Sequence, residues 1–202
     1  MWNPYYLTTI LSSRFVFKNL LRGKVSGEEN IPKTGPFIVE ANHLSHLDPP
    51  FIGGAFRSRE LMFMARKSLF KAGFLNFLLS RLNVIPVDKE HHGDIRAIRQ
   101  ALAALKRGLG LVIFPEGTRS LDGQLGKAQA GLGFLACQSR APVIPVRITG
   151  TFEILKKNTV WPDICHTPSI TIGLPIPYEA YHLFEKDYQH TADYLFEHIR
   201  QI

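Results

Sequence analysis

Two ionisable side chains, His43 and Asp48, flank a four-residue spacer in the segment NHLSHLD at 42–48. On one continuous helix they would point about 140° apart, because an α-helix has 3.6 residues per turn. Two prolines follow Asp48 and bias its backbone away from the helical region, so we predict a turn that folds the carboxylate back onto the imidazole. Such a pair suits general-base chemistry on a hydroxyl. The imidazole accepts the proton, and the carboxylate fixes the tautomer and stabilises the imidazolium.

Two other interpretations of this segment stay open from its residues alone. His43, His46 and Asp48 are residue types that bind metals, although no further His or Cys cluster with ligand spacing accompanies them. The other interpretation is a purely structural turn. In that case Asp48 is the N-cap of a helix that Pro49 begins and that runs to about Phe56.

A second polar turn has the sequence FPEGTRS and covers residues 114–120. Its Gly117 turn, the Thr118 hydroxyl and the Arg119 guanidinium form a set of donors that suits a phosphate. Arginine binds two phosphate oxygens at once, which lysine does not. Glu116 is unusual beside an anion, and we expect it to hold a hydroxyl of the ligand or to orient Arg119. The alternative is a surface turn without a ligand.

Strand and helix patterns alternate along the chain and must position these turns. Short apolar runs predict strands at 37–41, 61–65, 84–87, 111–114, 143–146 and 170–172, and a polar strand is predicted at 24–31. Helices are predicted at 5–22, 49–56, 94–107, 128–139 and 191–201. We therefore expect a single α/β domain with a twisted, mainly parallel or mixed sheet flanked by helices.

The first helix, at 5–22, is predicted to be amphipathic and to end at Gly23. Its apolar residues near one face are Leu7, Ile10, Leu11 and Phe15. It either packs on the domain or lies on a membrane surface. This divides the chain into an N-terminal helix at 1–23 and an α/β domain at 24–202.

The chain has 202 residues, a net charge of +7 and a pI of about 9.5. A protein this basic favours polyanions as partners. We expect it to bind an anionic membrane surface and not nucleic acid, because no nucleic-acid-binding motif accompanies the charge. No stretch is as apolar as a transmembrane helix of about 20 residues requires, and signal-peptide features are missing. The two cysteines are typical of thiols in a reducing compartment. These features predict a cytoplasmic protein, peripheral on the inner face of a membrane.

Four blocks of the chain resemble those of the 1-acyl-sn-glycerol-3-phosphate acyltransferase family, the glycerolipid acyltransferases with an H-x4-D motif. The blocks are residues 42–49, residues 65–69 with 83–89, residues 114–120 and residues 143–146, and their order and spacing agree over about residues 24–177. The resemblance implies transfer of a fatty acyl group from acyl-CoA or acyl carrier protein to the free hydroxyl of 1-acyl-sn-glycerol 3-phosphate. The product is phosphatidic acid, made in phospholipid biosynthesis. Glycerol 3-phosphate or another lysolipid as acceptor, and a non-catalytic lipid-binding module, are the alternatives.

The resemblance also implies roles for individual residues. It makes His43 the general base and Asp48 its partner, with no metal and no cofactor beyond the acyl thioester as co-substrate. The residues that it places at the phosphate of the acceptor are Glu116, Gly117, Arg119 and Lys67. For Lys67 the alternative is an exposed lysine at the start of a helix.

The second block departs from the family pattern at two positions. Where the family usually has a glycine near its start and an arginine at its end, this chain has Asn83 and Lys89. Lys89 keeps the positive charge without the fork of a guanidinium, and we expect it to bind the acceptor. The phenylalanine-rich run at 69–79 is predicted to be core, a membrane-dipping element or the wall of an acyl channel. His91 and His92 are predicted to be solvated in a loop.

Overall fold

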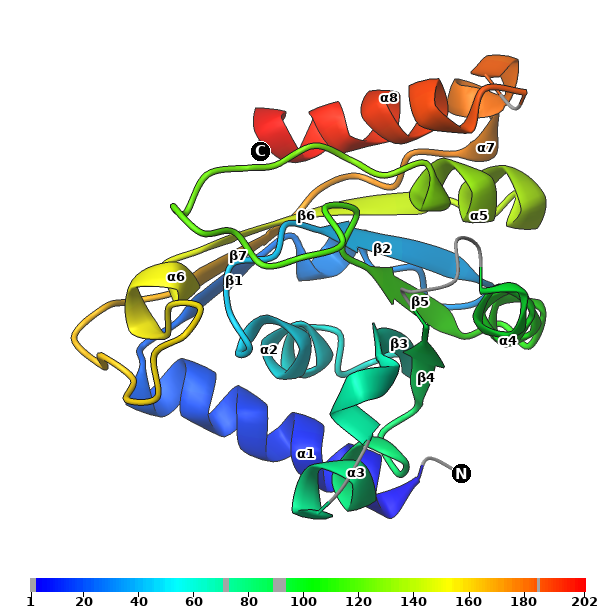
Figure 1. The fold of residues 1–202 in the computed structure, drawn as a ribbon. Helices are drawn as coiled ribbons and strands as arrows, with labels where there is room; N and C mark the ends of the chain where they lie inside the picture. The colour runs from blue at the N-terminus through cyan, green and yellow to red at the C-terminus, as the bar shows by residue number, and fades with distance from the viewer. Residues whose placement is uncertain (1–2, 71–72, 89–93, 185) are drawn as a thin grey trace.

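A seven-stranded sheet forms the centre of the molecule (Figure 1). The computed structural model describes residues 3–70, 73–88, 94–184 and 186–202. The strands are β1 (Lys24–Ser26), β2 (Phe37–Ala41), β3 (Leu61–Arg66), β4 (Val84–Val87), β5 (Gly110–Ile113), β6 (Val143–Thr149) and β7 (Ser169–Ile172). They lie in the order β1-β7-β6-β2-β5-β3-β4. The pair β6 and β7 is antiparallel and the other neighbouring pairs are parallel, so the sheet is mixed and mainly parallel, as predicted.

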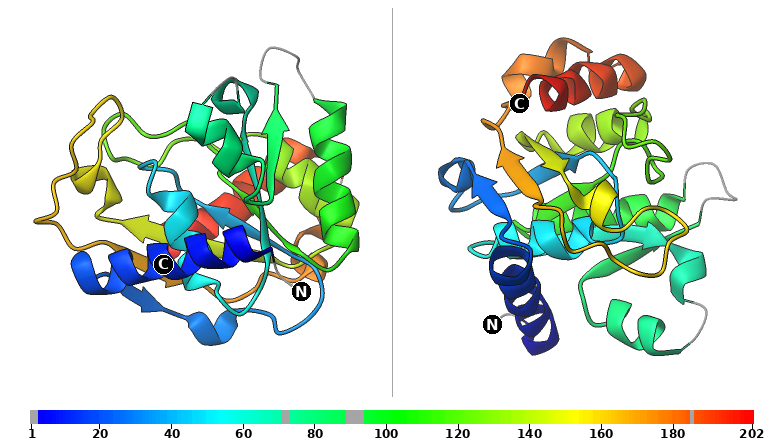
Figure 2. Two further views of the ribbon diagram at one scale, coloured as in Figure 1. Left: turned by 90° about the horizontal axis from the view of Figure 1, so that it is seen from below. Right: turned by 90° about the vertical axis from the view of Figure 1, so that its left-hand side faces the viewer.

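Helices cover both faces of this sheet (Figures 1 and 2). They are α1 (Pro4–Phe15), α2 (Asp48–Ala55), α3 (Gly73–Leu79), α4 (Ile95–Lys106), α5 (Gly131–Ser139), α6 (Thr151–Ile154), α7 (Tyr178–Tyr181) and α8 (Tyr188–Gln201). Because side chains alternate along a strand, Phe37 and Val39 of β2 join the core under α1 and α2, whereas Ile38 joins the core under α4, α5 and α8. The predicted α/β architecture is therefore confirmed.

The sheet geometry brings the two polar turns together. The strands β2, β3, β5 and β6 are parallel, so their carboxyl ends lie at one edge of the sheet. The segments that leave this edge are residues 42–48 after β2, residues 114–120 after β5 and residues 150–151 after β6. Three segments far apart in sequence thus meet at one place.

Two predicted elements differ in detail from the structure. The strand predicted at 24–31 is shorter, since β1 ends at Ser26 and a 3-10 helix follows at Glu28–Asn30. Asp48 is not an N-cap: Leu47 holds that position, and Asp48 is the first residue of α2. Its carboxylate is therefore available to the turn that precedes it.

The N-terminal helix packs on α2, and a π-helix at Val16–Leu20 extends it. The face buried on the domain consists of Tyr6, Ile10, Phe17 and Leu21. Three of the residues predicted for the apolar face, Leu7, Leu11 and Phe15, are exposed instead. The helix is apolar on two sides, and periodicity alone does not tell which side a domain covers.

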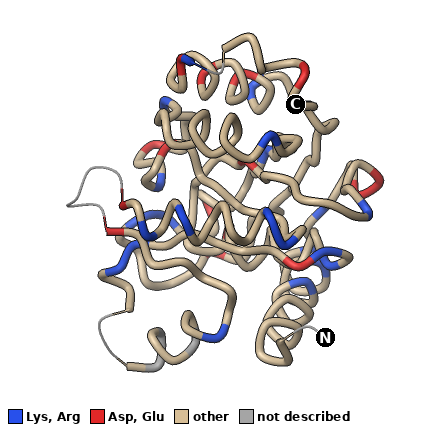
Figure 3. The backbone as a smooth tube through the Cα atoms, turned by 90° about the vertical axis from the view of Figure 1, so that its right-hand side faces the viewer, with Lys and Arg blue, Asp and Glu red and all other residues tan. Residues whose placement is uncertain are grey.

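Within the described part of the chain, no helix is long and apolar enough to cross a membrane. Basic residues are spread over helices and loops of both layers rather than gathered on one element (Figure 3). Charge alone therefore does not mark one face of this protein, and local groups of residues must be considered.

Candidate active site

His43 and Asp48 are in contact at the carboxyl edge of the sheet. The His43 Nδ1 lies 2.9 Å from Asp48 Oδ2, and the Asp48 side chain is completely buried. The turn predicted before Pro49 therefore exists and brings carboxylate to imidazole. The imidazole keeps 17% of its surface exposed, so its other nitrogen is accessible to a ligand.

The Asp48 carboxylate is held by several donors at once. Its Oδ2 accepts hydrogen bonds from the backbone N–H groups of Leu44 and Ser45, each at 2.7 Å. Its Oδ1 accepts one from the Thr151 hydroxyl, also at 2.7 Å. A carboxylate in this position accepts a hydrogen bond from Nδ1–H of His43. The neutral ring then carries its proton on Nδ1, and the lone pair of Nε2 is free to take another proton.

The His43 ring is oriented by packing as well as by Asp48. Phe114 stacks on the imidazole with ring centroids 4.1 Å apart and planes 23° apart. Just before His43, the Asn42 side chain pairs with both backbone groups of Ile148 on β6, at 2.7 and 2.9 Å. The backbone that carries the histidine is therefore fixed to two neighbouring strands.

The Glu116 carboxylate contacts the backbone at two places in the chain. Its Oε1 accepts from the His43 backbone N–H and its Oε2 from the Gly126 N–H, both at 3.0 Å. Burial raises the pKa of this carboxyl, and those two hydrogen bonds oppose the increase. Ser120 N–H in turn donates to the His43 carbonyl at 2.8 Å. Glu116 thus fixes the second turn to the first, and its hydrogen bonds go to backbone rather than to Arg119.

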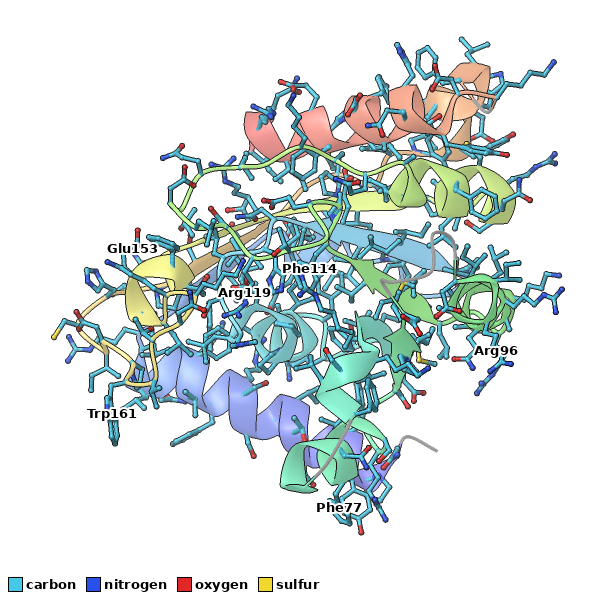
Figure 4. All side chains as sticks on the ribbon, in the orientation of Figure 1. Phe77, Arg96, Phe114, Arg119, Glu153 and Trp161 are labelled. Atoms are coloured by element: carbon cyan, nitrogen blue, oxygen red, sulfur yellow. The ribbon has the colours of Figure 1, made fainter. Side chains whose placement is uncertain are left out.

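The turn after β5 presents a cation beside the histidine. Gly117 has a φ of 66°, a left-handed conformation that glycine adopts without strain. Burial lowers the pKa of the half-buried Arg119, and the positive charge of Arg66 lowers it further. Figure 4 shows Arg119 and Phe114 at the centre of the molecule, between the sheet and α2. A guanidinium in this position suits an anion.

Lys67 is the cation that we predict beside Arg119, and in the structure its side chain lies near an acidic residue. Lys67 Nζ lies 3.4 Å from Asp88 Oδ2, and its side chain is 68% exposed. Lys157, from the loop after α6, donates to the Thr118 hydroxyl at 3.3 Å. Lys89, His91 and His92 lie outside the described residues.

An apolar cavity of about 450 Å³ opens beside Phe114, the residue that stacks on His43. Phe114 and His46 line its inner end, and Ile10, Gly53, Leu69 and Leu79 line the part that lies between α1, α2 and α3. Burial, Arg119 and His43 together lower the pKa of His46, which favours a neutral ring at this apolar wall. The run at 69–79 therefore contributes to the wall of a channel.

Sequence reasoning missed three positioning residues. Asn42 holds the backbone before His43, Thr151 donates to Asp48 from the start of α6, and the charge of Arg66 acts on the pKa of Arg119. Asn42 adjoins His43, and a buried polar residue at the end of an apolar strand was a usable signal. Thr151 lies 103 residues from Asp48 in sequence, and no sequence signal indicated that the two residues would be in contact. No group of three or more His, Cys, Asp or Glu side chains in the described ranges is arranged to hold a metal ion.

Asn83 explains one departure from the family pattern. Its φ is 55°, in the left-handed region that glycine favours and that asparagine tolerates better than most residues. Its side chain donates to Glu60 at 2.8 Å. The position thus keeps the backbone conformation without the glycine.

Known proteins are similar to this chain in sequence. The chain is 28% identical over 163 residues to the 1-acyl-sn-glycerol-3-phosphate acyltransferase of Bacillus subtilis, covering 74% of this chain and 80% of that protein. It is 28% identical to a chloroplastic 1-acyl-sn-glycerol-3-phosphate acyltransferase of Brassica napus, covering 65% of this chain but only 38% of that longer protein.

A solved structure and a family profile agree with these relatives. The crystal structure of the 1-acyl-sn-glycerophosphate (LPA) acyltransferase PlsC of Thermotoga maritima superposes with a TM-score of 0.74 at 29% identity, covering 96% of this chain and 78% of that one. The profile of the family described as Acyltransferase matches residues 22–149, which include both polar turns and all of β2 to β6. The chain therefore belongs to the acyltransferase family.

Proposed function

We propose that this protein transfers a fatty acyl group from acyl-CoA or acyl carrier protein to the free hydroxyl of 1-acyl-sn-glycerol 3-phosphate. The product is phosphatidic acid, an intermediate of phospholipid biosynthesis. One observation carries the proposal. Phe114, which stacks on His43, lines an apolar cavity that suits an acyl chain, and Asp48 acts on the pKa of Arg119, a cation that suits a phosphate.

The reaction uses His43 as a general base. Its Nε2 removes the proton from the acceptor hydroxyl while that oxygen attacks the thioester carbonyl. The tetrahedral intermediate then collapses, the new ester forms, and the carbon–sulfur bond breaks. The thiol leaving group has a pKa near 8.5, so it departs with little help from an acid. Asp48 stabilises the imidazolium, which afterwards loses its proton to the thiolate or to water.

The phosphate of the acceptor binds to Arg119 and Arg66. Gly117 contributes a backbone that a phosphate can approach closely, and the Thr118 hydroxyl is a further donor. Glu116 supports this turn from behind through the His43 and Gly126 backbone. A dianionic phosphate bound by both arginines compensates the repulsion between their charges.

The acyl chain of one substrate occupies the apolar cavity. Its volume of about 450 Å³ lies within the usual range for ligand cavities. Its wall includes the ends of α1 and α3, elements with exposed apolar residues such as Leu11 and Phe77. We therefore place the protein at the cytoplasmic face of a membrane, where lipid substrates enter from the bilayer.

The direct test is to incubate the purified protein with radiolabelled oleoyl-CoA and 1-acyl-sn-glycerol 3-phosphate in mixed micelles containing EDTA. Phosphatidic acid made by the wild type and not by His43→Ala supports acyl transfer without a metal. Loss of product only when EDTA is added would support a metal enzyme instead. Absence of product with either acyl donor, and with glycerol 3-phosphate or other lysolipids as acceptors, would contradict the proposal.

A further inference from the structure

The loop at 155–168, between α6 and β7, exposes large apolar side chains. Trp161 is 87% exposed and Val160 is 82% exposed. Ile164, a few residues later, is also more than half exposed. A tryptophan carries a large apolar surface that soluble proteins usually cover. Three such residues within five positions form a patch that requires an explanation.

This loop is ordered by hydrogen bonds rather than frayed. The Leu155 carbonyl accepts from the Ser45 hydroxyl at 2.9 Å, and the Asp163 N–H returns to the Ile154 carbonyl at 2.7 Å. Between these anchors, the Thr159 N–H and hydroxyl both donate to the Lys156 carbonyl. The backbone is thus closed at its base, and it holds Val160 and Trp161 at its tip.

Two lysines sit at the base of the same loop. Lys156 is exposed, and its ammonium lies 5.7 Å from the centre of the Phe152 ring. Lys157 bonds to Thr118, next to the proposed phosphate site. Lysine beside tryptophan is typical of segments that lie in the headgroup region of anionic membranes, where the ring enters the interface and the ammonium binds lipid phosphate.

The loop lies on the same side of the molecule as two other apolar elements. In Figure 1 it descends on the lower side to the level of α1, and α3 lies on that side too. Figure 4 shows Trp161 and Phe77 at this lower side, well separated from one another. The outer face of α1 adds Leu11 and Phe15, and the π-helix that extends it adds Leu20, all more than half exposed. These separate contacts on one side suit a flat partner such as a bilayer.

We propose that the loop at 156–164 is a membrane anchor, separate from α1, that binds an anionic bilayer. Val160 and Trp161 enter the headgroup region, while Lys156 and Lys157 contact lipid phosphates. Because Lys157 also contacts Thr118, the anchor holds the phosphate-binding turn at the height of the headgroups, where the acceptor presents its phosphate. This inference rests on the proposed function in one respect: the acceptor is a lipid that the protein has to reach.

Tryptophan fluorescence tests the insertion directly. The chain has two tryptophans, so Trp2→Phe leaves Trp161 as the single emitter. The vesicles contain about 30% phosphatidylglycerol, an anionic lipid. On binding to them, the emission of Trp161 should shift to the blue, and brominated acyl chains should quench it. Emission that stays unchanged while the protein sediments with the vesicles would overturn the proposal.

A matched pair of variants distinguishes binding through this anchor from nonspecific adsorption to vesicles. Trp161→Ser should weaken vesicle binding roughly tenfold or more, because a large side chain no longer leaves water. Leu183→Ser is the control, since Leu183 is 78% exposed but lies beside α7, on the opposite side of the sheet from α1. Equal vesicle affinities for the two variants would contradict the proposal.

Activity measurements then distinguish this inference from the proposed function. Trp161→Ser should lower transfer to an acceptor embedded in vesicles and leave transfer to a short-chain, water-soluble acceptor unchanged. If the loop instead docks a carrier protein, the variant keeps its vesicle affinity and loses activity only with a carrier-bound donor, which would overturn the membrane assignment. Vesicle binding through Trp161 by a protein that shows no turnover would refute the proposed function alone.

Discussion

The Thr151 hydroxyl donates a 2.7 Å hydrogen bond to Asp48 Oδ1, and the two residues are 103 positions apart in sequence. Thr151 begins the short helix α6, directly after β6, and its side chain is completely buried. Asp48 in turn contacts His43 through its other oxygen. The orientation of the imidazole therefore depends on a residue that never meets a substrate.

Replacing this hydroxyl tests how much positioning contributes. Thr151→Val keeps the shape but leaves Asp48 Oδ1 without its donor, a loss of about 1.5–3 kcal/mol for a bond to a charged group. We expect kcat to fall by roughly tenfold to a hundredfold, with the KM for the acceptor nearly unchanged. Thr151→Ser restores the donor and should recover most of the kcat. A valine variant with wild-type kcat would show that Asp48 is held adequately by the backbone alone.

The proposed general base, His43, gives a sharper prediction. His43→Ala should lower kcat by at least about 10²–10⁴-fold, the usual contribution of a positioned base. The melting temperature should change little, because the ring is partly exposed and is not part of either core. Circular dichroism and a thermal melt serve as controls for folding. Residual turnover within tenfold of the wild type would exclude His43 as the base.

The sequence predicted the elements of this fold because strand and helix patterns alternate clearly. The short strands β2 and β4 have the predicted limits. The N-terminal helix was less predictable. With apolar residues on two sides, its periodicity identified a helix but not the side that packs on α2.

The choice between Arg66 and Lys67 shows how a small error in a strand limit changes a site. The strand predicted to end at Ala65 extends one residue further, to Arg66. Side chains alternate across a strand, so neighbouring residues at its end point in different directions. Besides burial, the charge of Arg66 lowers the pKa of Arg119, whereas Lys67 pairs with Asp88. Element limits carry the largest error in sequence-based prediction.

These two neighbours provide a matched experiment. Arg66→Ala should raise the KM for the phosphorylated acceptor about tenfold, as expected for losing one charge-assisted contact of about 1.4 kcal/mol. Lys67→Ala should change it less than twofold, because that side chain faces Asp88 and solvent. Steady-state kinetics at varied acceptor concentrations measure both KM values. A larger effect at Lys67 would favour the role that the sequence predicted for it.

Glu40 is a buried carboxyl that the proposed reaction does not use. It lies in the middle of β2, opposite Ile113 and Pro145 on the neighbouring strands. Its side chain is completely buried, and neither carboxylate oxygen has a hydrogen-bond partner among the described residues. Burial raises the pKa of Glu40 well above its ordinary value of 4.5, so the folded protein keeps the proton to higher pH.

This carboxyl makes stability depend on pH in a defined direction. Above pH 4.5 the unfolded chain loses the Glu40 proton while the folded chain keeps it. The free energy of unfolding therefore falls by up to about 1.4 kcal/mol per pH unit until the folded pKa is reached. Glu40→Gln removes this term, so the variant should gain stability relative to the wild type as the pH rises. Urea unfolding at about pH 5 and pH 8 measures the difference.

Glu29→Gln, at an exposed position, is the control and should follow the wild type at both pH values. If Glu40→Gln has the same pH dependence as the wild type, Glu40 is ionised in the folded protein and must have a partner that compensates its charge.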